Sequence, residues 1–132
     1  MISVQAVCVG VITIDTIALV DKYPSADERV LADEISRAGG GPAAVAAVAL
    51  SRLGVRSAII GTIGDDFDGK EILRIFEKEG VDTSGISIGT TPTAGSVIVA
   101  SKEHSARAIS TRQPVTQAPM NDAAKKLIEI GR

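Results

Sequence analysis

Three consecutive glycines at positions 39–41 lead directly into an alanine-rich stretch that ends at Gly54. Pro42 suits the first position of a helix, and Gly54 suits the left-handed residue at which a helix stops. The glycines let the backbone turn and approach a ligand, while the helix N-terminus offers free N–H groups and the positive end of the helix dipole. The stretch therefore predicts either a cradle for an oxygen-rich or anionic small molecule, or a tightly packed turn between a strand and a helix.

The residues before the glycines indicate β-structure. Residues 4–10 are continuously apolar, which is typical of a strand buried on both faces of a parallel sheet. The stretches 12–20 and 29–37 predict two further strands. About 30 residues then separate the first strand from Pro42. This distance excludes a dinucleotide fingerprint, which needs its glycines directly after the first strand, and no Gly-Lys-Ser/Thr phosphate loop is present.

After Pro42 the chain alternates regularly between helices and strands, as a doubly wound α/β sheet requires. We expect a helix to Leu53, a strand at 57–63, a helix at 67–79, a short strand at 86–88, two strands at 93–101 and 106–111, and a final helix at 122–130. In the final helix, Ala124, Leu127 and Ile128 are expected to face the core.

Few residues are candidates for chemistry. Asp15 lies among isoleucines, either at an outward-facing strand position or as a carboxylate placed for ligand binding. The acids within 65–68 lack the spacing of a calcium loop and are better explained as a cap and first turn of a helix. The sole histidine, His104, falls at a turn with no partner acid, and the sole cysteine, Cys8, excludes a disulfide within one chain. We therefore expect no metal site.

Composition excludes several classes of partner. The net charge is −2 and aromatic residues make up 2% of the chain, so neither a basic patch nor a stacking surface is available for nucleic acid. No apolar run approaches the ~20 residues that span a bilayer, and the N-terminus lacks the pattern of a secretory signal. We expect a cytoplasmic protein without membrane or nucleic-acid partners.

Three motifs in order give the chain its resemblance to a known family. They are Val-Gly-Val-Ile-Thr-Ile-Asp at 9–15, Gly-Gly-Gly-Pro-Ala-Ala-Val-Ala at 39–46 and Gly-Thr-Ile-Gly-Asp-Asp-Phe-Asp-Gly at 61–69. Together they resemble the N-terminal part of the ribokinase-like, or PfkB-type, carbohydrate kinases. The resemblance implies a ribokinase-like doubly wound sheet with a small β lid. It also implies that Asp15 binds sugar hydroxyls and that Gly39, Gly40 and Gly41 line the sugar site.

The resemblance implies further features of the lid. Its strands would be those near 12–20, 29–37, 93–101 and 106–111, and in many relatives the lid also pairs two subunits, so a homodimer is expected. Many members have asparagine where this chain has Ala44, and the motif looks closer to the branch that includes sulfofructose kinase. A ketohexose-type sugar with an anionic substituent is then the expected substrate, with Thr111 and Arg112 facing that substituent or Arg112 simply solvated.

The family's C-terminal half, which carries the catalytic base and the nucleotide pocket, has no counterpart in these 132 residues. The expected function is thus the sugar-binding and lid portion of an ATP-dependent sugar kinase. No catalytic residue is expected in this chain, ATP and Mg²⁺ are expected in the intact protein, and neither is expected to bind this chain alone. The alternatives are a non-catalytic module that binds a small polyol or dimerises, and a purely structural α/β fragment.

Overall fold

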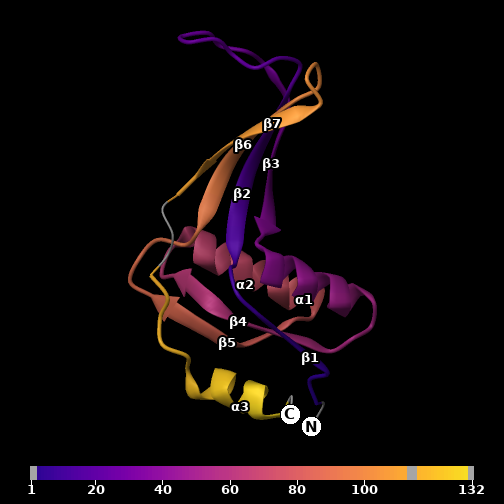
Figure 1. The fold of residues 1–132 in the computed structure, drawn as a ribbon, viewed down its shortest axis with the longest axis vertical. Coiled ribbons are helices and arrows are strands. Elements are labelled where there is room, and N and C mark those ends of the chain that lie inside the picture. The colour runs from indigo at the N-terminus through magenta and orange to yellow at the C-terminus, as the bar shows by residue number, and fades with distance from the viewer. Residues whose placement is uncertain (1–2, 113–115, 131–132) are drawn as a thin grey trace.

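The computed structural model describes residues 3–112 and 116–130. Along these residues the chain forms two sheets with helices packed on one of them (Figure 1). In order, the elements are β1 (Ala6–Val9), β2 (Thr13–Val20), β3 (Ala32–Gly40), α1 (Pro42–Arg52), β4 (Ser57–Gly64), α2 (Phe67–Glu79), β5 (Asp82–Gly89), β6 (Gly95–Ser101), β7 (Ala106–Thr111) and α3 (Asp122–Ile130). The predicted α/β class with a small β lid is confirmed.

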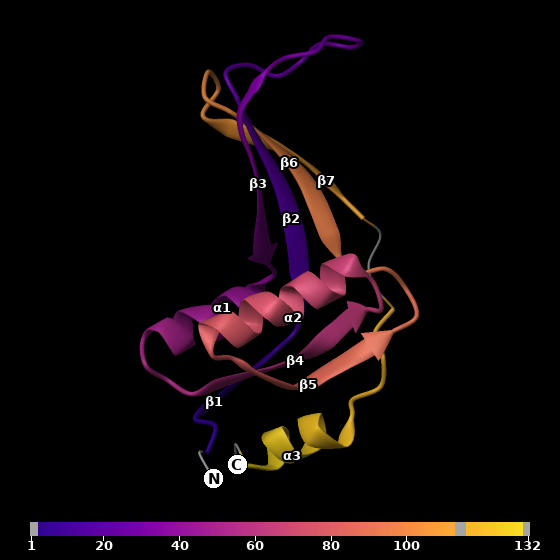
Figure 2. The ribbon, with the colours of Figure 1, turned by 180° about the vertical axis from the view of Figure 1, so that it is seen from behind.

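The core sheet has the strand order β1-β4-β5, and all of its pairings are parallel. Its middle strand, β4, is buried along nearly its whole length. Ile59 and Ile63 of β4 pack into the cluster formed with α1 and α2, whereas Ala58 and Ile60 pack against α3. Figures 1 and 2 show the same layers, with α1 and α2 on one face of the sheet and α3 on the other.

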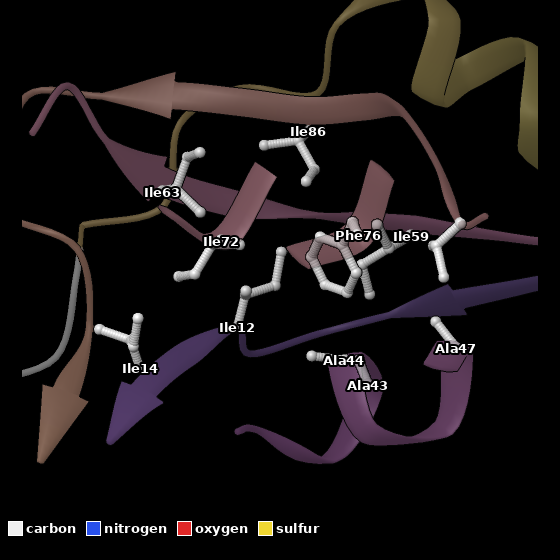
Figure 3. Packing of buried hydrophobic residues seen from close by; sticks show 11 residues of the cluster. Ile12, Ile14, Ala43, Ala44, Ala47, Ile59, Ile63, Ile72, Phe76 and Ile86 are labelled. Carbon is white, nitrogen blue, oxygen red and sulfur yellow. The ribbon is translucent and has the colours of Figure 1, made fainter. Parts of the chain in front are cut away.

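The larger apolar cluster joins the base of the lid to the core. Ile12, in the link between β1 and β2, is 2% exposed and contacts the same cluster as Ile59 and Phe76 (Figure 3). Ile14, the second residue of β2, is also buried in it. The lid is therefore rooted in the core by apolar side chains at the start of β2, and burial of each such side chain stabilises by about 1.5–3 kcal/mol.

The lid sheet has the order β3-β2-β6-β7 and rises away from the core sheet (Figures 1 and 2). Strand β2 pairs antiparallel with β3 but parallel with β6, and β6 pairs antiparallel with β7. The chain enters the lid after the carboxyl ends of β1 and β5. The lid thus stands at the edge of a parallel sheet where α/β folds bind ligands.

Local signals located the helices well. Asp66 caps α2 by accepting a hydrogen bond from the Gly69 N–H at 2.8 Å, and Gly80 ends it with φ of 72°. The capping role of an acid at this position was predicted. Asn121 likewise caps α3, because its Oδ1 accepts a hydrogen bond from the Ala124 N–H at 2.7 Å.

Some expectations differ from the structure. The strand placed at 29–37 lies at Ala32–Gly40, so Gly39 and Gly40 belong to a strand and only Gly41 turns. The reason is the long pairing with β2, which extends through Gly40. The prediction that Ile128 faces the core is wrong. It is 36% exposed, because α3 buries only a narrow stripe through Ala124 and Leu127.

Candidate functional site

A row of polar side chains runs across the lid sheet at Asp15. Asp15 of β2 is opposite Ser96 of β6, and Ser96 is opposite Thr111 of β7. Residues directly opposite one another in a sheet present their side chains to the same face. Asp15, Ser96 and Thr111 therefore share one face of the lid, and we call them the polar row.

The Asp15 carboxylate is oriented by two hydroxyl groups. Ser96 Oγ donates a hydrogen bond to Asp15 Oδ1 at 2.5 Å, and Thr13 Oγ1 donates to the same oxygen at 3.4 Å. Within residues 3–112 and 116–130, the other oxygen, Oδ2, accepts no side-chain hydrogen bond. A carboxylate accepts hydrogen bonds at both oxygens, so Oδ2 retains capacity for a ligand hydroxyl.

Gly40 lies directly against this carboxylate. A Cβ atom built on Gly40 would stand 2.5 Å from Asp15 Oδ2 and 2.7 Å from Thr13 Oγ1, separations too short for a real methyl group. At Gly39 a Cβ atom would meet nothing within 4 Å. The absence of a side chain at position 40 therefore makes room for the Asp15 carboxylate itself, whereas position 39 carries no such constraint.

Gly41 connects β3 to α1. It precedes Pro42 with φ of 92° and ψ of 137°, a conformation that residues other than glycine rarely adopt. A Cβ atom there would also collide with the Val11 carbonyl oxygen. Among the described residues no side chain caps this helix, and no acid lies in its first turn. The N–H groups and the positive end of the dipole at the start of α1 are therefore not compensated there by a side chain.

The structure brings most of the predicted site residues into one region. Asp15 and Thr111 share the polar row, and Gly39–Gly41 run from the strand beside Asp15 to the start of α1. Arg112 is placed differently. Its Nη1 donates to the Thr93 carbonyl at 2.8 Å and its backbone N–H donates to the Gly95 carbonyl at 2.9 Å, so its guanidinium is directed to the base of β6.

Two polar residues beside Asp15 were missed from the sequence. Thr13 precedes Asp15 by two positions, and the two-residue period of a strand already places both on one face. Ser96 could be found only by knowing that β2 and β6 pair in parallel, which no local signal reveals.

A cavity of about 390 Å³ lies between α1 and α2. It is lined mainly by apolar side chains of the two helices and reaches Thr13, Gly39 and Ala44. Asp15 is not among the residues that line it. This space is therefore a groove between helices that ends near the glycines, and it does not enclose the carboxylate.

The remaining reactive groups show no sign of a catalytic or metal centre in the part of the chain that the structure describes. There, His, Cys, Asp and Glu side chains do not gather in groups of three or more that could hold a metal ion. Burial raises the pKa of the Cys8 thiol, which favours the unreactive protonated form. His104 is exposed in the turn between β6 and β7. Its ring packs edge-on against the ring of Tyr23, with 5.4 Å between the two ring centres. None of the described helices has the length and apolar character needed to cross a bilayer.

Comparisons with known proteins identify the family of the chain. The model of the pfkB family carbohydrate kinases matches residues 4–128. The chain is 37% identical over 93 residues to the ketohexokinase of Mus musculus, covering 67% of this chain and 30% of that protein. It is 36% identical over 85 residues to the ATP-dependent ribose-1-phosphate kinase of Halopiger xanaduensis, covering 64% of this chain and 29% of that protein.

A solved structure shows the same arrangement of elements. The ribokinase of Arabidopsis thaliana, determined in complex with ribose and ATP, superposes with a TM-score of 0.77 over 96% of this chain and 43% of that chain, at 21% identity. This likeness supports the fold. The chain thus spans about 30% of the length of the two curated relatives.

Proposed function

Because the chain belongs to the pfkB family of carbohydrate kinases, we propose that it supplies the sugar-binding and lid portion of an ATP-dependent sugar kinase. The observation that carries the proposal is the polar row beside the glycine run. It combines a pre-oriented carboxylate that packs against Gly40 with a helix N-terminus at the ligand-binding edge of a parallel sheet.

Asp15 is the proposed anchor of the sugar. With Oδ1 held by Ser96 and Thr13, the carboxylate has a defined orientation before any ligand arrives. Charge-assisted hydrogen bonds from sugar hydroxyls to such an acceptor are stronger than neutral ones. Little orientational freedom remains to be lost on binding, which favours affinity.

The glycines form the second wall of the proposed site. Gly40 makes room for the Asp15 carboxylate in this orientation, and Gly41 turns the chain so that α1 begins close to it. The N–H groups at the start of α1 suit the oxygen atoms of a sugar.

Thr111 and Arg112 were predicted to face one end of the sugar. Thr111 shares the polar row with Asp15, which supports this role for its hydroxyl group. For Arg112 the role stays a prediction, because direct contact with a substituent on the sugar requires its guanidinium to leave the Thr93 carbonyl.

The substrate class remains part of the proposal. We favour a ketohexose-type sugar, and similarity to a ketohexokinase supports that choice. Similarity to a kinase named for ribose 1-phosphate is compatible with an anionic substituent on the sugar. The family match does not distinguish among branches, so relation to the sulfofructose kinase branch stays a prediction from the motif around Ala44.

ATP is the proposed phosphoryl donor, and the names of the relatives support it. The described residues do not fit a magnesium site, because their acidic side chains form no ligand group. The proposal therefore assigns ATP, Mg²⁺ and the catalytic base to parts of the kinase outside these 132 residues, and derives no catalytic step from this chain. A cytoplasmic location stays a prediction.

Calorimetry on the 132-residue chain tests the sugar site. D-Fructose and D-ribose are titrated into the parent chain, Asp15→Asn and Glu129→Gln. Glu129 is an exposed carboxylate on α3, outside the lid, and serves as the control. We expect binding to the parent and Glu129→Gln, and at least tenfold weaker binding to Asp15→Asn, because each charge-assisted hydrogen bond contributes about 1.5–3 kcal/mol. Equal affinity in all three would remove Asp15 from the site.

The same titrations with ATP, and a phosphorylation assay on the uninterrupted reading frame, separate the proposal from its alternatives. Turnover of a ketohexose by the longer protein, lost in Asp15→Asn, supports the kinase. Sugar binding with no ATP-dependent turnover in any form would instead favour a non-catalytic polyol-binding module.

Pairing through the lid is the proposed mode of dimerisation. Strand β7 is exposed along its whole length, and Ile109 on it is 50% exposed. Ile17, Ile98 and Ile109 are opposite one another and lie on the same face as the polar row, one repeat further along the strands. Such an apolar face favours association with a second copy.

Light scattering tests this pairing. We expect a dimer for the parent and a monomer for Ile109→Lys. Ile35→Lys is the control because Ile35 is also exposed, at 70%, but lies on the opposite face of the lid. A monomeric parent, or loss of the dimer in the control alone, would exclude pairing through the Ile109 face.

A further inference from the structure

The segment Gly64–Gly69, here called the acidic turn, joins the end of β4 to the first turn of α2. Its acids were explained as helix capping, and Asp66 does cap α2. Capping, however, uses only one of the hydrogen bonds that Asp66 accepts. Thr93 provides two more, from its backbone N–H to Oδ2 at 2.8 Å and from its hydroxyl to Oδ1 at 2.5 Å.

Thr93 lies just before β6 and is fully buried. Its hydroxyl oxygen also accepts a hydrogen bond from the Gly64 N–H at 2.9 Å, and its carbonyl accepts from Arg112 at the end of β7. Partial burial opposes ionisation of Asp66, but the bonds from Thr93 and Gly69 and the charge of Arg112 together lower its pKa. The start of β6 and the end of β7 are therefore tied to the ionised carboxylate of Asp66.

The edge strand β3 is also tied to the acidic turn. Arg37 of β3 forms an ion pair with Asp68, and its guanidinium lies 5.7 Å from the centre of the Phe67 ring. β3 and β7 are the two edge strands of the lid sheet. Asp68 thus holds the edge strand β3, while Asp66, two positions before it, holds the segment that leads into the inner strand β6.

Two glycines make these contacts possible. A Cβ atom on Gly64 would lie 2.6 Å from the Thr91 carbonyl oxygen and 2.7 Å from the Thr93 nitrogen. A Cβ atom on Gly69 would collide with the Gly64 carbonyl oxygen. The close approach of the segment before β6 to the acidic turn therefore depends on the absence of side chains at both positions.

We propose that the acidic turn is a positioning element that sets the orientation of the lid sheet, and with it the polar row, relative to the start of α1. The covalent links between core and lid include Gly10 and Gly41, both at positive φ, which a lid could pivot about. The contacts of Asp66 and Asp68 restrain that pivoting at the start of β6 and at β3. The consequence for sugar binding rests on the proposed function, whereas the restraint on the lid does not.

Spin-label distance measurements test the restraint directly. In a Cys8→Ser background, labels are placed at Glu103→Cys in the β6–β7 turn and Lys78→Cys on α2, both exposed positions. Arg37→Gln and Thr93→Val each remove contacts to the acidic turn. Arg52→Gln is the matched control, because Arg52 forms a similar ion pair with Glu79 at 2.5 Å but joins α1 to α2.

We expect one narrow distance distribution in the background chain and in Arg52→Gln, and at least a twofold broader one in Arg37→Gln and Thr93→Val. Circular dichroism checks that each variant is folded. If Thr93→Val does not fold, Arg37→Gln, a surface change, decides the question. Distributions as narrow in Arg37→Gln as in the control would overturn the proposal.

Calorimetry with D-fructose then tests the consequence for the site. If the broader range of lid orientations leaves only about one fifth of the molecules competent to bind sugar, the apparent affinity for D-fructose falls about fivefold. We expect that loss in Arg37→Gln and none in Arg52→Gln at equal thermal stability. A broader distance distribution in Arg37→Gln with unchanged affinity for D-fructose would refute the positioning role. If the parent binds no sugar but the distance distribution is still broader in Arg37→Gln, the proposed function fails and the restraint on the lid stands.

Discussion

Gly39 and Gly41 belong to one run of glycines, yet the structure predicts opposite effects of alanine at the two positions. At Gly41, φ of 92° strains any other residue by about 1–3 kcal/mol. The new methyl group would also collide with the Val11 carbonyl oxygen, and moving packed backbone adds a further cost of about 1–3 kcal/mol. We expect Gly41→Ala to lower the free energy of unfolding by about 3 kcal/mol.

At Gly39 a methyl group meets nothing within 4 Å, and the residue lies in a strand without positive φ. Alanine at position 39 chiefly lowers the conformational entropy of the unfolded chain. Less entropy is then lost on folding, which stabilises a protein by about 0.4–1 kcal/mol. Gly39→Ala is therefore expected to be neutral or slightly stabilising. The expected difference between the two variants is about 3–4 kcal/mol.

Urea unfolding followed by circular dichroism measures both values. For a chain of this size, about 3 kcal/mol also corresponds to a fall in Tm of roughly 10 °C. Equal losses at the two positions, within about 0.5 kcal/mol, would show that the glycines are needed as a flexible run. The assignment of a specific turn to Gly41 would then be refuted.

Three further predictions concern other parts of the fold. Ile59→Ala, at a fully buried core position, should lower the free energy of unfolding by about 3–4 kcal/mol in urea, whereas Val45→Ala at a 56% exposed position should change it little. Asn121→Ala should cost about 2 kcal/mol in thermal unfolding, because it removes the cap of α3 and two hydrogen bonds to β5 carbonyls. The pKa of Asp66 is lower in the folded protein than in the unfolded chain, where it is near 4, so the ionised carboxylate stabilises the fold at pH values above about 4. This contribution disappears as the pH falls through the pKa of the folded state. The difference in stability between parent and Asp66→Asn should therefore shrink on acidification below about pH 4, and a constant difference would contradict this assignment.

Features that depend on neighbouring residues were predictable from the sequence. The bounds of α2 follow from Asp66 and Gly80, whose capping chemistry acts within one turn of the helix. The family resemblance rested on three motifs in order and is confirmed by a match over residues 4–128.

Features that depend on distant pairing were not predictable in the same way. The extension of β3 through Gly40 follows from its register with β2, and the placing of Ser96 beside Asp15 follows from a parallel pairing with β6. The acidic turn shows the same limit. Capping was visible from 64–69 alone, whereas the partners Thr93 and Arg37 come from other elements.

The parallel pairing of β2 with β6 also determines the order in which the molecule can assemble. The hydrogen bond between Asp15 and Ser96 closes a separation of 81 residues, and nearly the whole core lies between them. Closing so long a loop is entropically costly until the core has brought its ends together. During synthesis β2 and β3 therefore emerge early, and the edge of β2 that pairs with β6 stays unpaired until β6 and β7 have been made. We expect the core to fold first and the lid to be the slow, aggregation-sensitive step, so the sugar site is the last part of the chain to form.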